Sequence, residues 1–179
     1  MQPLIITLRL DAATEAILTA LRTRYFPRQL NHLSSHITFF HALPGTSQHL
    51  ISHQLQHVTS TMTAFTVQVS SPFAMGRKGV ALNVVSSDLS SLHKQLLDAW
   101  KTEKIELTSQ DDNAKKRAHV TVQNKVGEEV ARKTLGEMKA QWEPKMATAE
   151  GLRLWRYEQG GEWTLLEDFL FQDRNLARQ

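Results

Sequence analysis

Two short segments of this chain share one pattern of residues: histidine, an apolar residue, threonine and a second apolar residue. The first is His36-Ile37-Thr38-Phe39 and the second is His119-Val120-Thr121-Val122. Side chains of a β-strand alternate between two faces, so each segment would direct its histidine and threonine to one face and its apolar residues to the core. The pattern therefore predicts two half-buried strands that each present a histidine beside a threonine.

The repetition of the pattern makes a chance occurrence less plausible. With 8 histidines and 16 threonines in 179 residues, about 0.7 His-x-Thr pairs would occur by chance. A third copy, His57-Val58-Thr59, lies in a segment whose apolar residues recur at helical spacing, where residues two apart do not share a face. We therefore set the third copy aside and retain the other two as a pair.

The two retained copies occupy equivalent places in two similar halves. Alternating apolar residues predict strands at 4–10, 37–43, 65–69, 80–85, 118–122, 152–157 and 163–171, and helical spacing predicts helices at 11–25, 46–61, 89–100 and 127–142. Each half begins with a strand and a helix, and each motif strand is followed by another helix. This order suggests an internal duplication.

We expect an α+β fold of one domain spanning 1–179. Its two lobes, approximately 1–75 and 76–179, would be related by a pseudo-twofold axis, and strands could be exchanged between them. Each lobe would supply a mainly antiparallel sheet flanked by helices, and a central cleft would lie between the two sheets.

The amino-acid composition excludes several kinds of catalytic and metal site. The chain has no cysteine, so thiolate catalysis and cysteine zinc sites are excluded. The net charge of +3 is mild and suits a nucleotide or an RNA end better than a long duplex. No apolar run approaches the roughly 20 residues needed to cross a bilayer. We expect a monomer of the cytoplasm or nucleus, with no membrane association and no obligate protein partner.

The paired motifs resemble those of the two-histidine phosphoesterase superfamily, which includes 2′,5′ RNA ligase-like proteins and cyclic nucleotide phosphodiesterases. The segments Gln123-Asn124 and Leu154-Trp155-Arg156-Tyr157 also resemble that family, so that the similarity covers nearly the whole chain. Many relatives have proline directly before each motif histidine, whereas this chain has Ser35 and Ala118 there.

The resemblance implies a phosphodiesterase that acts on a 2′,3′-cyclic phosphate or a 2′,5′ linkage of a nucleotide or RNA end. Histidine exchanges protons readily near neutral pH, so His36 and His119 would divide the general acid and general base work. Thr38 and Thr121 would donate hydrogen bonds to the phosphate oxygens. No metal or cofactor is expected, and the motifs leave open which histidine is the acid.

Further residues are candidates for substrate binding. Phe40 and Gln123 would share a strand face with the motif threonines, and Trp155 and Tyr157 share a face on which a nucleobase could stack. Arg77, in the basic turn with Lys78, could attract phosphate, as could the segment Lys115-Lys116-Arg117.

Three other functions remain open. The same site could trim RNA 3′ ends as an exonuclease, or it could hydrolyse a cyclic phosphate of ADP-ribose. In a different class, the chain could be an RNA-binding module without catalysis, although the retention of both histidines and both threonines argues against that reading.

Overall fold

A computed structural model describes residues 2–113 and 117–173, which contain four α-helices, seven β-strands and two short 3-10 helices. The helices are α1 (Ala12–Tyr25), α2 (Gln48–Thr61), α3 (Ser87–Thr102) and α4 (Glu128–Gln141), and the 3-10 helices span Arg28–Leu30 and Gly45–Ser47. The strands are β1 (Leu4–Leu10), β2 (Ile37–Leu43), β3 (Phe65–Ala74), β4 (Val80–Val85), β5 (His119–Gln123), β6 (Lys145–Tyr157) and β7 (Trp163–Leu170).

Every helix and strand expected from the sequence is present, but β3 and β6 are longer than predicted. β3 runs through Pro72 to Ala74. It tolerates the proline because β6 pairs only with Phe65–Val69 of β3, which leaves one edge of the strand free beside Pro72. β6 begins at Lys145, and the first residues of the strand form the pairing with β3.

All seven strands belong to one antiparallel sheet in the order β1-β2-β5-β4-β3-β6-β7. β1 also pairs with β6, so six strands close into a ring and β7 is added outside β6. The α+β class and the antiparallel pairing are as expected, but the prediction of two separate sheets was wrong. The physical reason is the length of β6, whose first part pairs with β3 and whose later part pairs with β1.

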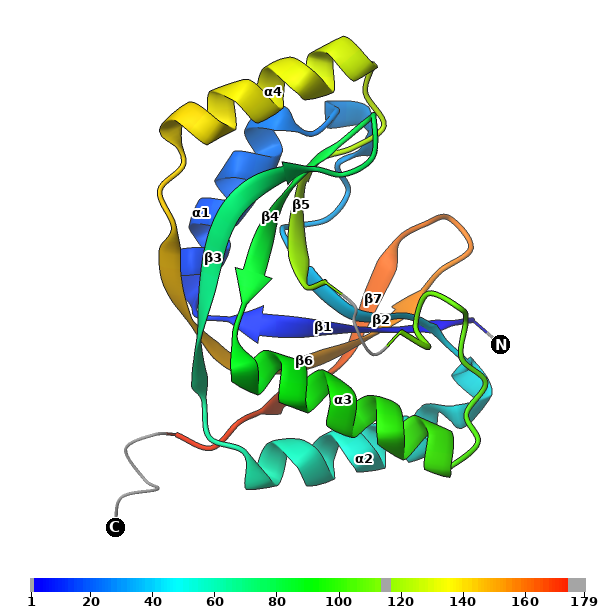
Figure 1. The fold of residues 1–179 in the computed structure, drawn as a ribbon. Coiled ribbons are helices and arrows are strands. Elements are labelled where there is room, and N and C mark those ends of the chain that lie inside the picture. Colours follow the sequence, from blue (N-terminus) through cyan, green and yellow to red (C-terminus); the bar gives the residue numbers. More distant parts are fainter. Residues whose placement is uncertain (1, 114–116, 174–179) are drawn as a thin grey trace.

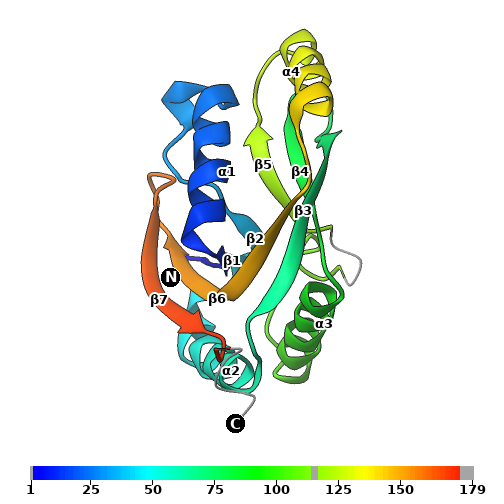
Figure 2. The ribbon, with the colours of Figure 1, turned by 90° about the vertical axis from the view of Figure 1, so that its left-hand side faces the viewer.

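The helices occupy two ends of this sheet. α1 and α4 lie toward one end, and α2 and α3 lie together at the other (Figures 1 and 2). Each end thus combines one helix from the first half of the chain with one from the second. The third His-x-Thr copy lies within α2, where the hydroxyl of the buried Thr59 donates a hydrogen bond to the carbonyl of Leu55 at 2.9 Å. It is therefore part of a helix, as expected.

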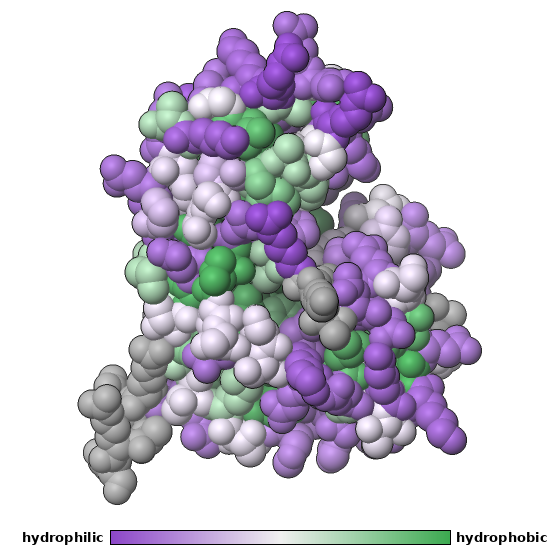
Figure 3. Space-filling model, viewed as in Figure 1, coloured by the Kyte–Doolittle hydropathy of each residue, from purple (hydrophilic) through white to green (hydrophobic). Residues whose placement is uncertain are grey.

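One apolar core joins the strands and helices, with Phe40 and Trp100 among its largest fully buried side chains. The start of α1 is fixed by Asp11, whose carboxylate accepts hydrogen bonds from the backbone N–H groups of Thr14 and, in β6, Thr148, both at 2.9 Å. Within the described ranges, none of the helices has the length and apolar character required of a membrane span. Figure 3 shows the surface hollowed beside the β6–β7 hairpin.

Candidate active site

The two motif strands are direct neighbours in the sheet. Ile37 of β2 and Val120 of β5 are antiparallel partners, and both are buried. In an antiparallel pair, the positions on either side of these partners set Thr38 opposite His119 and His36 opposite Thr121. The four polar residues therefore share the face opposite Ile37 and Val120, and each histidine lies across the strand pair from the threonine of the other motif.

His36 is oriented by the backbone just before it. Its Nδ1 atom lies 2.9 Å from the carbonyl oxygen of Ser34. A carbonyl oxygen only accepts hydrogen bonds, so Nδ1 must carry the hydrogen. In the neutral ring the lone pair is then on Nε2, the nitrogen that is left to act as a base.

His119 repeats this arrangement in the second motif. Its Nδ1 lies 2.9 Å from the carbonyl oxygen of Arg117, again two residues earlier. An aromatic ring stands beside each histidine: Trp163 lies 4.8 Å from His36 and Phe73 lies 6.1 Å from His119, measured between ring centroids. Both imidazoles are thus held in the same tautomer.

The environment of His36 favours its neutral form. Burial, together with the charges of Arg22, His41 and His119, lowers the pKa of His36 to about 4, against the opposing effect of the hydrogen bond to Ser34. A group with a pKa near 4 is uncharged at pH 7. His36 is therefore in the neutral form there, the only form in which a histidine can act as a base.

Ser35, which stands before His36 where many relatives have proline, makes a backbone hydrogen bond that proline could not make. The backbone N–H of Ser35 donates to the hydroxyl of Thr19 at 3.2 Å, and the hydroxyls of the two residues lie 3.1 Å apart. Proline has no N–H and could not make the first of these bonds. Ser35 instead fastens the loop before His36 to α1.

Arg22 is a component of the site that sequence reasoning missed. Its side chain is buried, with 5% of the residue exposed, and burial lowers its pKa to about 10. Nε donates to Asn31 in the loop before the first motif, and Nη1 donates to the carbonyl of Thr121 in the second, both at 2.9 Å. Among the described residues, no carboxylate forms an ion pair with Arg22. One buried cation thus connects the two motifs.

A sequence signal for Arg22 did exist. The buried residues of α1 are Thr14, Leu18 and Arg22, which are spaced four apart and so form one stripe. A charged residue in the buried stripe of a helix is unusual and marks a position with a special role.

Phe40 and Gln123 are buried and do not lie open beside the motif threonines. Phe40 is fully buried in the core, and Gln123 is buried with its amide nitrogen donating to the carbonyl of Tyr25 and the hydroxyl of Thr134. The expectation that they share the face of the motif threonines fails because regular alternation does not continue that far.

A register shift follows the threonine in both motif strands. On β1, Thr7 and Ile6 pair with Thr38 and Phe40, so Phe39 is an extra residue. On β4, Ala81 and Val80 pair with Thr121 and Gln123, so Val122 is extra in the same way. An extra residue in one strand re-aims the side chains that follow it, and such bulges are common beside active sites. The second apolar residue of each motif is therefore where the strand changes face.

The three other candidates for substrate binding are Trp155, Tyr157 and Arg77, and they differ in their contacts and exposure. Trp155 is partly buried, donates from Nε1 to the hydroxyl of Thr7 at 2.8 Å and contacts Trp163, which touches His36. Tyr157 is 39% exposed and pairs across the hairpin with Trp163. Arg77 is exposed and forms an ion pair with Glu128 at 2.6 Å, which holds it at the start of α4.

One residue near His36 was missed by the sequence analysis, and one predicted basic segment is described only in part. Trp163 was not singled out from the sequence; the β6–β7 hairpin pairs it with Tyr157. The predicted basic segment 115–117 is described only at Arg117, because Lys115 and Lys116 lie outside the described residues.

Comparison with known proteins identifies relatives of this architecture. The model of the 2′-5′ RNA ligase superfamily matches residues 10–161. The crystal structure of TT0787 from Thermus thermophilus matches with a TM-score of 0.65 and 14% identity, over 96% of this chain and 99% of that one. E. coli LigT complexed with 3′-AMP matches with a TM-score of 0.67 and 13% identity, over 96% and 98% of the two chains.

At these identities the solved structures show a shared fold. Other crystal structures of E. coli LigT with the same fold contain NADP+, phosphate or ATP. No curated protein matches the chain.

Proposed function

Because the chain belongs to the 2′-5′ RNA ligase superfamily, we propose that it is a phosphodiesterase acting on 2′,3′-cyclic phosphate or 2′,5′ linkages of nucleotides or RNA ends. The observation that carries this proposal is that the two motif imidazoles are oriented by the same kind of backbone hydrogen bond. Each motif histidine has Nδ1 bonded to a backbone carbonyl, so each leaves Nε2 for proton transfer. On this proposal the halves 1–75 and 76–179 contribute one motif each.

The different surroundings of the histidines support a division of roles. His36, with its pKa near 4, is neutral and takes a proton from the attacking water. The water oxygen bonds to phosphorus and the bond to one ribose oxygen breaks. His119, in its protonated form, gives its Nε2 proton to that departing oxygen. Two histidines supply both proton transfers, so the proposed reaction needs no metal.

The threonines stabilise the phosphate as negative charge builds on its oxygens. Thr38 and Thr121 are both half-buried and carry hydroxyls that can donate to non-bridging oxygens. The hydroxyl of Thr121 is 3.6 Å from the sulfur of Met75, a weak acceptor that a phosphate oxygen readily replaces. The nucleotide complexes of E. coli LigT support a nucleotide as the ligand here as well.

The test is hydrolysis of the four nucleoside 2′,3′-cyclic phosphates in EDTA, with 2′- and 3′-phosphate products resolved. We expect turnover that is lost in His36→Ala and in His119→Ala. His57→Ala is the matched control, because His57 belongs to the third His-x-Thr copy and lies exposed on α2. Turnover that survives in either active-site variant would refute the proposed mechanism.

The same assay separates the alternative substrates. Oligoribonucleotides with free 3′ ends, ADP-ribose cyclic phosphate and 2′,5′-linked dinucleotides, offered under identical conditions, rank the substrate classes by kcat/KM. A folded protein that turns over none of them would favour the non-catalytic binding module.

A further inference from the structure

A further histidine of the first half lies close to the first motif. His36 directly precedes β2, and His41 lies within this strand, five residues later. Regular alternation along the strand would direct His41 to the face opposite His36. The register shift after Thr38 changes the face on which His41 lies, and 33% of its side chain is exposed there.

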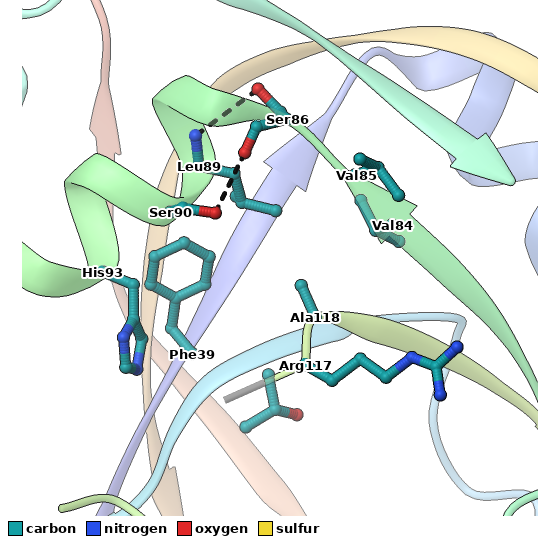
Figure 4. Close-up of a pocket in the computed structure, with 10 residues that line it drawn as sticks. Phe39, Val84, Val85, Ser86, Leu89, Ser90, His93, Arg117 and Ala118 are labelled. Atoms are coloured by element: carbon teal, nitrogen blue, oxygen red, sulfur yellow. Dashed lines mark hydrogen bonds between the residues drawn. The ribbon is translucent and has the colours of Figure 1, made fainter. Parts of the chain in front are cut away.

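The two phenylalanines that precede His41 face the same side of β2. Phe39 and Phe40 are 2% and 0% exposed, and their rings lie 5.7 and 5.0 Å from the ring of His93 on α3, measured between centroids. Figure 4 shows the Phe39 ring directed toward α3 and close to His93. Two successive residues thus point toward α3, so alternation resumes one residue late. His41 therefore returns to the polar face of the motif.

His41 lies a short distance along this face from the proposed reaction centre. Thr38 is opposite Thr7 of β1, and the register sets His41 beside Ile5, two residues from Thr7. Two residues of a strand span about 7 Å. The charge of His41 is also close enough to contribute to the lowered pKa of His36. A group attached next to a phosphate held between the two motif histidines would thus come within reach of His41.

A buried carboxylate holds His41 in place. Asp111, in the segment that follows α3, is 0% exposed. Its carboxylate accepts hydrogen bonds from the backbone N–H groups of His41 and Ala42 at 2.9 to 3.0 Å. One of its oxygens also lies 3.5 Å from Nδ1 of His41. A carboxylate beside Nδ1 favours a hydrogen on that nitrogen, so Nε2 is the nitrogen left for a ligand.

This arrangement suits an anion at Nε2. Because Asp111 is enclosed by protein, a ligand on the polar face of the motif meets the imidazole of His41 and not the carboxylate. An anion at Nε2 and a carboxylate at Nδ1 together favour the imidazolium, which donates a hydrogen bond from each nitrogen. Such charge-assisted hydrogen bonds are strong with phosphate oxygens.

The second motif has no histidine at the equivalent position. Its register shift occurs at the same place, and the residue five positions after His119 is Asn124. The side chain of Asn124 accepts a hydrogen bond from the backbone N–H of Lys125 at 2.8 Å. The two halves therefore differ here, and the additional imidazole lies on the side of the first motif.

We propose that His41 binds a second phosphate of the substrate, carried on the 5′ oxygen of the ribose whose cyclic phosphate is held between His36 and His119. The inference rests on the proposed function, because it takes the reaction centre from it. The 5′ phosphate is a monoester in a 5′-phosphorylated nucleotide and a diester at the end of an RNA chain. In both, it is separated from the cyclic phosphate by one ribose, as His41 is separated from the reaction centre by a short step along β2.

Three substrates test this subsite. Adenosine 2′,3′-cyclic phosphate has no second phosphate, its 5′-phosphorylated form adds a monoester, and the dinucleotide ApA with a terminal 2′,3′-cyclic phosphate adds a diester. His41→Gln retains a polar side chain of similar size but cannot carry the positive charge. His53→Gln makes the same change at an exposed position of α2 and is the matched control. Thermal unfolding establishes that both variants are folded.

The quantity to compare is the ratio of kcat/KM with and without the second phosphate. We expect wild type and His53→Gln to prefer a substrate with a second phosphate by about tenfold or more, and His41→Gln to lose this preference. A preference for only the monoester or only the dinucleotide would identify the source of the phosphate. A wild-type ratio near one for both substrates, or a ratio that is unchanged in His41→Gln, would overturn the inference.

A binding measurement distinguishes failure of the subsite from failure of the proposed function. In calorimetric titrations, wild type should bind adenosine 3′,5′-bisphosphate about tenfold more tightly than adenosine 3′-monophosphate, and His41→Gln should bind the two alike. If this result is obtained but no cyclic phosphate is hydrolysed, the proposed function fails and the subsite stands. Equal affinities in wild type, no binding of either probe, or an advantage that survives in His41→Gln would refute the subsite.

Discussion

Ile37 of β2 and Val120 of β5 are cross-strand partners, and this one pairing brings together motifs that lie 83 residues apart in the chain. Because each is the central apolar residue of its motif, the pairing sets the histidine of one motif beside the threonine of the other. The candidate site is thus assembled from two half-sites that repeat each other. Arg22 connects them from α1.

The acid limb of the pH profile should report the pKa of His36. As the proposed base, His36 works only when neutral, so kcat/KM should hold as the pH falls from 7 and then decline through about pH 4. Steady-state rates across this range, with folding monitored at each pH, make the measurement. A decline centred near pH 6.5, the ordinary value for histidine, would contradict a base with the lowered pKa of His36.

Arg22→Met should move that limb to higher pH. The positive charge of Arg22 lowers the pKa of His36, so its removal lets that pKa rise. Arg22→Lys keeps the charge but loses the bonds to Asn31 and Thr121, so kcat should fall while the limb stays near its wild-type position. Arg24→Met, at an exposed position of the same helix, is the matched control. A limb that does not move in Arg22→Met contradicts this electrostatic role.

The hydroxyls of Thr38 and Thr121 should act mainly on kcat. Thr38→Val and Thr121→Val preserve side-chain shape but remove the donor to the developing phosphate charge, so each should lower kcat by about 100-fold. Thr23→Val, exposed on α1, should have no effect. Steady-state kinetics of the single variants give the answer, and a change confined to KM would assign the hydroxyls to ground-state binding.

Trp163 should be a positioning residue for His36. Its ring lies 4.8 Å from the imidazole, so Trp163→Ala frees the histidine and should lower kcat/KM by about tenfold or more. Trp163→Phe retains a ring and should recover most of the activity. Leu165→Ala, two residues further along β7 and already 46% exposed, serves as the control. Equal activity of the Ala and Phe variants would exclude this role.

Asp11 should contribute to stability in a pH-dependent way. Burial raises the pKa of Asp11, but hydrogen bonds from Thr14 and Thr148 outweigh it, so the pKa lies below its ordinary value. Such a carboxylate stabilises the fold at neutral pH, and this contribution is lost as the pH falls through the lowered pKa. Asp11→Ala should therefore lower the free energy of unfolding by about 1–2 kcal/mol at pH 7.

Urea unfolding followed by circular dichroism measures this effect. Asp11→Asn keeps an oxygen that can cap α1 and should lose less. The difference between wild type and Asp11→Ala should shrink as the pH falls below the ordinary pKa of an aspartate, and it should vanish once the pH has passed the lowered pKa at which folded Asp11 is protonated. A difference that is constant with pH would mean that the charge of Asp11 contributes nothing.

Local patterns in the sequence were sufficient to predict most elements of the fold and the four motif residues of the candidate site. Apolar alternation and helical spacing predicted the seven strands and four α-helices of the described residues, because these patterns reflect the periodicity of a single element. The same alternation singled out His36 and Thr38, and His119 and Thr121, since each pair shares a strand face. Residue type alone indicated acid–base chemistry.

What only the tertiary structure decided depends on contacts between distant segments. The register shifts after Thr38 and Thr121 sent Phe40 and Gln123 into the core, and no local pattern encodes where a partner strand skips a residue. The closure into one sheet required β6 to reach both β1 and β3. The lowered pKa of His36 comes from burial and from charges brought in by other elements, Arg22 among them. Periodicity determines which face of an element is apolar, whereas the packing of one element on another determines its surroundings.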